Sequence, residues 1–361
     1  MKKVGKVAAV MMTSMLVLSA CNTTNLKLEK TANRTAQTNV SSNHDNMANM
    51  GNMKHGKYVN ENTILPTQKN INEKATPVKI ERIGEHEVNV TMTSTVTDVQ
   101  VAPDVLYKAW TYNGQAPGPV VIVNKGDTIH FTLENHDPTV MHSMDFHAVH
   151  TSPTKNFADV KTNDKGTFTY KASDVGVFMY HCGTAPVMMH IANGMVGTII
   201  VKDHAHPYPN KVDKEYVVIN NEWFDSGNSE DMKQGNPSHY TMSVRELANG
   251  KFGDTPFVAK VGDKVRLYFE NVGMSQPVSF HVVGTVFDDV YLDGNPYNHL
   301  KGMQSVMIPA SGGAVVEFTV VDEGTYSVLS HQFDQAMKGS LAKLIVTKDG
   351  KLPAQPAAAK H

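Results

Sequence analysis

The sequence predicts an all-β protein made of two tandem β-sandwiches, and three observations support this prediction. Between residues 76 and 349, short runs alternate apolar and polar side chains, for example at 88–93, 129–133 and 265–269. Gly, Pro, Asn and Asp separate these runs, which is typical of sheets that bury one face. The chain also has 361 residues, which is long enough for two hydrophobic cores.

An internal repeat divides the β region into two copies. Residues 126–135 (GDTIHFTLEN) match residues 262–271 (GDKVRLYFEN), and residues 194–201 (GMVGTIIV) loosely resemble residues 339–346 (GSLAKLIV). Repeats of this kind indicate that one structural unit occurs twice. We therefore expect two sandwiches of similar topology joined near residue 206.

The N-terminus resembles the signal of an exported bacterial lipoprotein. Lys2, Lys3 and Lys6 precede an apolar run at 7–18, which is too short for a comfortable transmembrane helix. The following Leu-Ser-Ala-Cys is similar to a lipobox, which implies cleavage before Cys21 and lipid on its side chain. An ordinary signal peptide with an incidental Cys is the alternative. The first interpretation predicts an exported, membrane-anchored protein that faces the periplasm or the cell surface.

A polar tether follows the signal. Residues 21–75 are rich in Asn, Thr, Ser and Lys and show no apolar period, which predicts disorder. Met47, Met50 and Met53 recur at every third position there, and thioethers are soft ligands suited to Cu(I). A polar linker with chance Met residues is the alternative. The predicted organisation is a signal peptide (1–20), the tether with its Met/His-rich segment (21–75), a first sandwich (76–205), a second sandwich (206–349) and a flexible tail (350–361).

Charge and cysteine content limit the class of function. The formal net charge is −2, which argues against a nucleic-acid partner and against binding to a membrane through a polybasic surface. The chain has two cysteines, and a lipid on Cys21 would leave Cys182 without a disulfide partner. A lone thiol in an exported protein needs a reason to persist, and metal ligation supplies one.

Cys182 begins a motif typical of a copper site for electron transfer. His190 and Met195 follow it in a Cys-x7-His-x4-Met pattern. A thiolate, two imidazoles and a weak axial thioether form such a site. The second sandwich has no Cys, and Ser340 stands where the first has Met195, so only the first can hold this copper.

Strand parity predicts a second group of ligands on the opposite face. Neighbouring residues of a strand point to opposite sides, so His181 faces away from Cys182. In the extended segment 142–147, His142 differs in parity from Asp145 and His147. His142 can therefore join the cysteine group, and Asp145 and His147 can join His181.

These residues together resemble the copper-containing nitrite reductases over roughly residues 80–348. The resemblance implies two tandem cupredoxin-like Greek-key β-sandwich domains and two coppers per chain, one of type 1 and one of type 2. It assigns the type 1 ligands to His142, Cys182, His190 and Met195, two type 2 ligands to His147 and His181, and the active-site aspartate to Asp145.

The second repeat carries two further motifs of this family. Residues 279–284 (SFHVVG) resemble the segment that bears the active-site histidine, which implies that role for His281 and places Val283 in the substrate pocket. Residues 326–332 (YSVLSHQ) resemble the segment with the third type 2 ligand, here His331. In this family that ligand comes from a neighbouring subunit, so the resemblance implies a homotrimer.

The resemblance also implies the reaction, which is the dissimilatory one-electron reduction of nitrite to nitric oxide and water. The electron would pass from type 1 to type 2 copper through His181, and Asp145 and His281 would supply protons as a general acid pair. No Cys-x-x-Cys-His haem motif is present, so we expect an external donor such as a small cytochrome c or a cupredoxin.

Two other functions use part of the same motif. A two-domain multicopper oxidase needs several His-x-His pairs and a His-Cys-His, whereas this chain has His181-Cys182-Gly183. A surface cupredoxin that only carries electrons would need the Cys182 group alone. Copper stoichiometry separates the three: two per chain for the reductase, four for the oxidase and one for the carrier.

Overall fold

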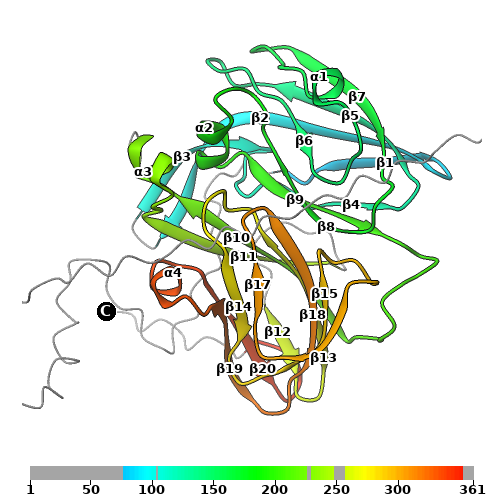
Figure 1. Ribbon diagram of the computed structural model, residues 1–361, viewed down its shortest axis with the longest axis vertical. Helices are drawn as coiled ribbons and strands as arrows, with labels where there is room; N and C mark the ends of the chain where they lie inside the picture. The colour runs from blue at the N-terminus through cyan, green and yellow to red at the C-terminus, as the bar shows by residue number, and fades with distance from the viewer. Residues whose placement is uncertain (1–75, 103–104, 226–228, 248–256, 353–361) are drawn as a thin grey trace, which may run out of the picture. The chain divides into compact units, whose positions relative to one another are not determined.

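The computed structural model describes residues 76–102, 105–225, 229–247 and 257–352. The predicted signal peptide, Cys21, the tether with its Met residues and nearly all of the C-terminal tail lie outside these ranges. Within them, strands dominate and helices are short, which confirms the all-β prediction (Figure 1).

The first half of the described chain forms two facing sheets. One has the order β1-β2-β5-β7 with β3 also paired to β2, and the other has the order β4-β9-β8-β6. Helix α1 (Pro153–Asn156) and helix α2 (Val187–Ala192) interrupt the strands. The strands are β1 (Lys79–Gly84), β2 (Glu87–Ala102), β3 (Val105–Tyr112), β4 (Val121–Asn124), β5 (Thr128–Asn135), β6 (Asp145–Phe146), β7 (Lys165–Lys171), β8 (Gly176–His181) and β9 (Val196–Lys202).

The second half forms two more sheets, of order β11-β10-β13-β18-β15-β16 and β12-β20-β19-β14-β17. Its helices are α3 (Ser229–Gln234) and α4 (Phe333–Met337). The strands are β10 (Lys214–Trp223), β11 (His239–Glu246), β12 (Val258–Lys260), β13 (Lys264–Asn271), β14 (Val278–Val282), β15 (Phe287–Leu292), β16 (His299–Met303), β17 (Val306–Ile308), β18 (Gly312–Thr319), β19 (Gly324–Ser330) and β20 (Leu341–Thr347).

The two sandwiches repeat one topology. The matching sequences form β5 and β13, which pair in parallel with β2 and β10 respectively. Gly126 and Gly262 precede them with φ of +91° and +92°, a left-handed conformation that favours glycine in both turns. The parallel pair β4–β9 likewise corresponds to β12–β20. The predicted duplication is therefore visible in the strand pairing.

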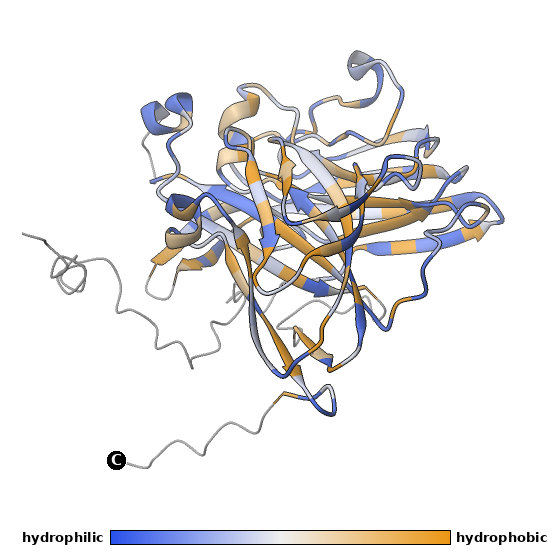
Figure 2. Cartoon of the chain, turned by 60° about the horizontal axis from the view of Figure 1, so that its bottom comes forward, coloured by the Kyte–Doolittle hydropathy of each residue, from blue (hydrophilic) through white to orange (hydrophobic). Residues whose placement is uncertain are grey.

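Alternating side chains fill a core in each sandwich. Strand β5, for example, alternates between buried and half-buried residues, and Figure 2 shows alternating apolar and polar bands along the strands. A third apolar cluster joins Val177 and Ile200 of the first sandwich to Tyr268, Tyr291 and Val315 of the second. Strand β8 therefore packs against the second sandwich, and this packing holds His181, the last residue of β8, in place.

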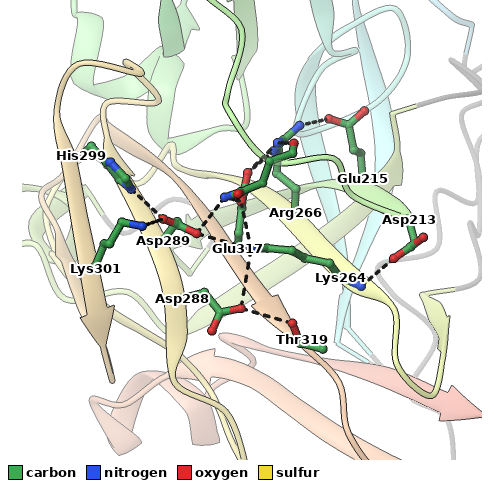
Figure 3. Close-up of polar contacts among 11 residues, drawn as sticks. Asp213, Glu215, Lys264, Arg266, Asp288, Asp289, His299, Lys301, Glu317 and Thr319 are labelled. Carbon is green, nitrogen blue, oxygen red and sulfur yellow. Dashed lines mark hydrogen bonds and ion pairs between the residues drawn. The ribbon is translucent and has the colours of Figure 1, made fainter.

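A network of ion pairs covers part of the second sandwich (Figure 3). Arg266 on β13 donates from Nε to Glu317 on β18 at 2.7 Å and from Nη1 to Glu215 on β10 at 2.9 Å. Its Nη2 donates to the carbonyl of Asn210 at 2.8 Å, and the Asn210 amide donates to Glu317 at 2.6 Å. The network therefore fastens the segment between β9 and β10 to the second sandwich.

Among the residues that the structure describes, no helix has the length and hydropathy needed to span a bilayer.

Candidate metal centres

Three side chains of the predicted cysteine group converge in the interior of the first sandwich. Cys182, His142 and His190 are all buried and together form one candidate metal group. The Cys182 Sγ atom lies 3.3 Å from Nδ1 of His190 and 4.0 Å from Nδ1 of His142, and these two nitrogens are 3.2 Å apart. A metal about 2 Å from each nitrogen would separate the nitrogens by about 3.5 Å in a trigonal plane, so the donor triangle has a suitable size.

Backbone hydrogen bonds hold this group in place. Cys182 directly follows β8, and its N–H donates to the carbonyl of Met195 at 3.1 Å. The Met195 N–H donates in turn to the carbonyl of His190, at the end of α2, also at 3.1 Å. His142 lies in an isolated bridge with Val160. Met195 is fully buried and packs in the same apolar cluster as Cys182.

Burial sets the protonation of the three donors. It lowers the pKa of His190 to about 4, with the nearby His142 adding to the effect. It also lowers the pKa of His142, although Asp137 opposes this, and it raises the pKa of the Cys182 thiol. Both imidazoles are therefore neutral near pH 7 and can offer lone pairs. The thiol gives up its proton when a cation binds, which couples metal binding to proton release.

Several partners of this group were not predicted from the sequence. The N–H of Ser143 donates to the Cys182 sulfur at 3.3 Å, and the Ser143 hydroxyl accepts from Gly183 N–H at 3.0 Å. The Trp110 ring on β3 lies 4.7 Å from the His190 ring and 5.7 Å from the His142 ring, between centroids. No local pattern connects Trp110 to residues so far along the chain, so only the fold reveals it.

The second predicted group lies on the other side of β8. Asp145, His147 and His181 form the other candidate metal group among the described residues. The Nε2 atoms of His147 and His181 are 3.1 Å apart, and Oδ2 of Asp145 is 3.8 Å from Nε2 of His181. His181 Nδ1 is 2.9 Å from the Cys182 carbonyl, which can only accept a hydrogen bond. The Nε2 lone pair of His181 therefore faces His147.

The predicted residues of the second repeat lie near each other but outside both groups. The rings of His281 and His331 are 5.5 Å apart between centroids. His281 on β14 is half-buried, and its Nδ1 donates to the carbonyl of Gln304 at 2.5 Å. His331 is exposed, and its N–H donates to Ser279 at 2.7 Å. Val283, two residues after His281, is 44% exposed.

The two groups offer different chemistry. The first combines a thiolate with two imidazoles in a buried site and suits copper that cycles between two oxidation states. The second offers imidazoles and a carboxylate near the surface, where His147 is exposed. No third group of this kind occurs in the described ranges of the chain.

Comparison with known proteins identifies the family of this chain. The multicopper oxidase family matches residues 94–206 and 231–351. A copper-containing nitrite reductase of Neisseria gonorrhoeae is 36% identical over 284 residues, which cover 75% of this chain and 71% of the relative. A solved multicopper oxidase, 21% identical with a TM-score of 0.64, shows likeness of fold alone.

Two solved nitrite reductases are more similar than that oxidase. The copper nitrite reductase of Nitrosomonas europaea has a TM-score of 0.67 and 34% identity, and the match covers 73% of this chain and 95% of that one. The copper-containing nitrite reductase of Thermus scotoductus SA-01 has a TM-score of 0.66 and 30% identity, with coverage of 75% and 67%. These matches confirm the two-domain cupredoxin fold. The chain therefore belongs to the multicopper oxidase family and to the copper-containing nitrite reductases.

Proposed function

We infer that the protein is a copper-dependent nitrite reductase that converts nitrite, one electron and two protons into nitric oxide and water. The observation that carries this inference is the pair of donor groups on opposite sides of one strand end, at Cys182 and His181, in a chain of this family. A surface electron carrier would need the Cys182 group only. A protein that only carries electrons would have no use for the Asp145–His147–His181 group.

We propose that His142, Cys182, His190 and Met195 hold a type 1 copper and that His147, His181 and His331 hold a type 2 copper. The thiolate and two neutral imidazoles of the first group favour a metal that changes oxidation state. When bound, the two coppers would supply one-electron transfer and a position where nitrite replaces water. The protein fixes both positions through β8, because His181 and Cys182 are consecutive residues.

The short covalent connection between the two groups suits electron transfer. His181 contributes its ring to the second group, and its Nδ1–H donates to the carbonyl of Cys182. The two groups are therefore joined both through the peptide and through this hydrogen bond. Strand β8 is packed on both sides, so the connection does not need to reorganise during turnover.

Asp145 and His281 are the residues that we propose supply protons. Asp145 is half-buried and lies 3.8 Å from the ring of His181, within reach of a substrate held there. His281 donates from Nδ1 to Gln304, which leaves Nε2 free to hold and release a proton. Two such groups can act as a general acid pair while the N–O bond breaks and water leaves.

We further propose that the active protein is a homotrimer in which His331 completes the second group of a neighbouring subunit. His331 is not part of the Asp145–His147–His181 group of its own chain, yet it is exposed and available to a partner. Phe333 and Met337 on the adjacent α4 are 59% and 66% exposed, and such apolar side chains favour burial against another surface.

We also propose that the protein is exported, carries a lipid on Cys21 and receives electrons from an external small cytochrome c or cupredoxin. The signal-like N-terminus supports export and lipidation. Near the first group, Met141 and Val187 are 43% and 37% exposed, which offers a donor an apolar contact beside His142 and α2.

Nitric oxide production tests the function directly. Copper-loaded protein supplied with a one-electron donor should produce nitric oxide from nitrite under anaerobic conditions and should contain two coppers per chain. Asp145→Asn should keep both coppers and lose most turnover, because the amide cannot donate the proton as an acid. A fully loaded wild-type protein that binds nitrite and is reduced by the donor but releases no nitric oxide would refute the assignment.

Mixing inactive variants tests the shared site. His331→Ala and His147→Ala each remove a proposed ligand, so each homotrimer should lose copper from the second group and be inactive. Mixed trimers should recover some activity, because a site that takes all its ligands from unaltered positions can form between two chains. A verified mixed trimer without any recovery would contradict the shared site.

A further inference from the structure

Asp137 is a buried carboxylate that divides its two oxygens between a loop and a proposed copper ligand. It lies in the segment that connects β5 to His142, and neither its side chain nor that of His142 is exposed. Its Oδ1 accepts hydrogen bonds from the N–H and hydroxyl of Thr139, both at 2.8 Å, and from Val140 N–H at 3.1 Å. Its Oδ2 lies 3.0 Å from Nε2 of His142.

This contact decides which nitrogen of His142 carries the proton. An ionised carboxylate can only accept, so Nε2 of His142 must be the donor. Nδ1 is then left with a lone pair, and Nδ1 is the atom that faces Cys182 and His190. The structure therefore presents the lone pair of His142 to the metal position before any metal arrives.

The internal repeat shows how the corresponding loop folds in the second sandwich, which has no cysteine-centred group. In the first sandwich, Asn135 accepts from the N–H of Asp137 at 2.9 Å and donates to the Val140 carbonyl at 2.9 Å. In the second, Asn271 accepts from the N–H of Gly273 at 3.3 Å and donates to the Gln276 carbonyl at 2.9 Å. The same turn thus forms with glycine at the position of Asp137.

A carboxylate also stabilises the corresponding loop of the second sandwich, but it belongs to a residue on another strand. Glu222 on β10 accepts from the N–H groups of Met274, Ser275 and Gln276 at 3.2, 3.1 and 2.7 Å. Both oxygens of Glu222 are used on that loop. In the first sandwich, one oxygen of Asp137 serves the loop, and the other is free for His142. The position of Asp137 thus adds a function that the second copy lacks.

We propose that Asp137 is a positioning residue of the first copper centre, which fixes the tautomer of His142 and favours Cu(II) over Cu(I) through its buried negative charge. This inference rests on the proposed function in one respect, namely that the Cys182 group holds copper. A hydrogen-bonded partner of a ligating histidine orients the ring and raises its basicity. The charge stabilises the more positive metal, so it lowers the reduction potential of the centre.

Asp137→Asn in the copper-loaded full chain tests this role. The amide oxygen can still accept from Thr139 and Val140, but the amide nitrogen facing His142 would be a donor. It would favour the tautomer with a proton on Nδ1, which competes with copper. We expect Cu(II) affinity at this centre to fall about 10–100-fold. With Cu(I) affinity unchanged, this loss raises the reduction potential by about 59–118 mV for a one-electron couple. The visible charge-transfer band should shift as well.

Thr139→Val is the matched control. It removes the Thr139 hydroxyl from Asp137 and leaves the contact with His142 intact, so it perturbs only the loop. The control should keep the wild-type potential. Equal shifts in both variants, or an Asp137→Asn potential within 10 mV of wild type, would overturn the proposal. If the wild type itself shows no visible band on copper loading, the copper assignment fails instead.

A measurement on the unaltered protein covers the case in which Asp137→Asn does not fold. In the reduced, diamagnetic protein labelled with ¹⁵N-histidine, the Nε2–H proton of His142 should lie downfield and exchange slowly with water. The Nε2–H of His190 is the internal comparison, because Asp137 does not contact it. Exchange of the two protons at the same rate would overturn the proposal.

Discussion

Replacing Arg266 by Met should destabilise the protein strongly without changing its copper centres. Only 7% of Arg266 is exposed, and it is the main partner of Glu317, whose side chain is completely buried (Figure 3). The substitution would remove the two contacts from Nε and Nη2 to Glu317, at 2.7 and 2.6 Å. Glu317 would then be a buried charge with weaker compensation.

The structure sets the expected size of the effect. Breaking a buried ion pair by removing one partner typically costs about 3–5 kcal/mol. Asn210 still donates to Glu317, and Lys264 remains 3.8 Å away, so the loss should lie near the lower end, at about 3 kcal/mol. At about 2.1 cal/mol/K per residue, the unfolding entropy of the roughly 260 described residues converts this loss into a fall of about 5 °C in Tm.

Denaturant and thermal unfolding of three variants would test this reasoning. Adding Glu317→Leu to Arg266→Met should recover at least half of the lost stability, because it removes the unpaired charge. Lys301→Met is the surface control; Lys301 lies 3.3 Å from Asp289 but is 73% exposed, so its loss should cost less than about 1 kcal/mol. A double variant no more stable than Arg266→Met would refute the buried-charge argument.

Three further predictions concern the copper, the tether and acid stability. Cys182→Ala should abolish the intense visible band and donor-coupled turnover while the second centre keeps its copper, as absorption and metal analysis would show. Deleting residues 22–60 from a soluble form should leave turnover of the loaded protein unchanged, because that composition cannot form a core. Burial alone would raise the pKa of Asp289, but hydrogen bonds from His299 and Lys301 outweigh it and lower the pKa. Asp289 therefore adds stability above about pH 4 that is lost as pH falls through its folded pKa, and Asp289→Asn should reduce this acid dependence in unfolding titrations.

The structure gathers the candidate ligands into the two groups that strand parity predicted, but the assumption behind that prediction holds for only one of the two segments. The argument holds for His181 and Cys182, because β8 is a regular strand up to His181. It assumed that residues 142–147 are extended, yet only Asp145 and Phe146 form a strand there. His142 reaches the cysteine group through its bridge with Val160 and its contact with Asp137.

Contacts between distant segments could not be predicted from the sequence. Trp110 packs on the ring of His190, and Ser143 donates to the sulfur of Cys182, across 80 and 39 positions of the chain respectively. A role for Asp137 could have been inferred from the sequence, because the internal repeat aligns Asp137 with Gly273. A charged residue in one copy opposite a glycine in the other indicates that the charge serves something besides the turn.

The equivalence of the two copies explains how one fold supplies both halves of the proposed site. Cys182 donates its N–H to the Met195 carbonyl, and Ser330 donates in the same way to the Ser340 carbonyl, so serines occupy the positions of the two proposed sulfur ligands. Ser340 is buried, and its hydroxyl donates to Oδ1 of Asn220 at 2.7 Å, so a hydrogen bond stands where we propose metal coordination in the first copy.

The strand pairing extends this equivalence to the two proposed proton donors. Asp145 pairs with His181, which directly precedes Cys182, and His281 pairs with Leu329, which directly precedes Ser330. Asp145 and His281 therefore occupy the same position of the repeated strand. The duplication thus provides two titratable side chains at one position of the fold. The homotrimer that we propose would bring copy one of one chain to copy two of the next and so place both side chains at the same substrate.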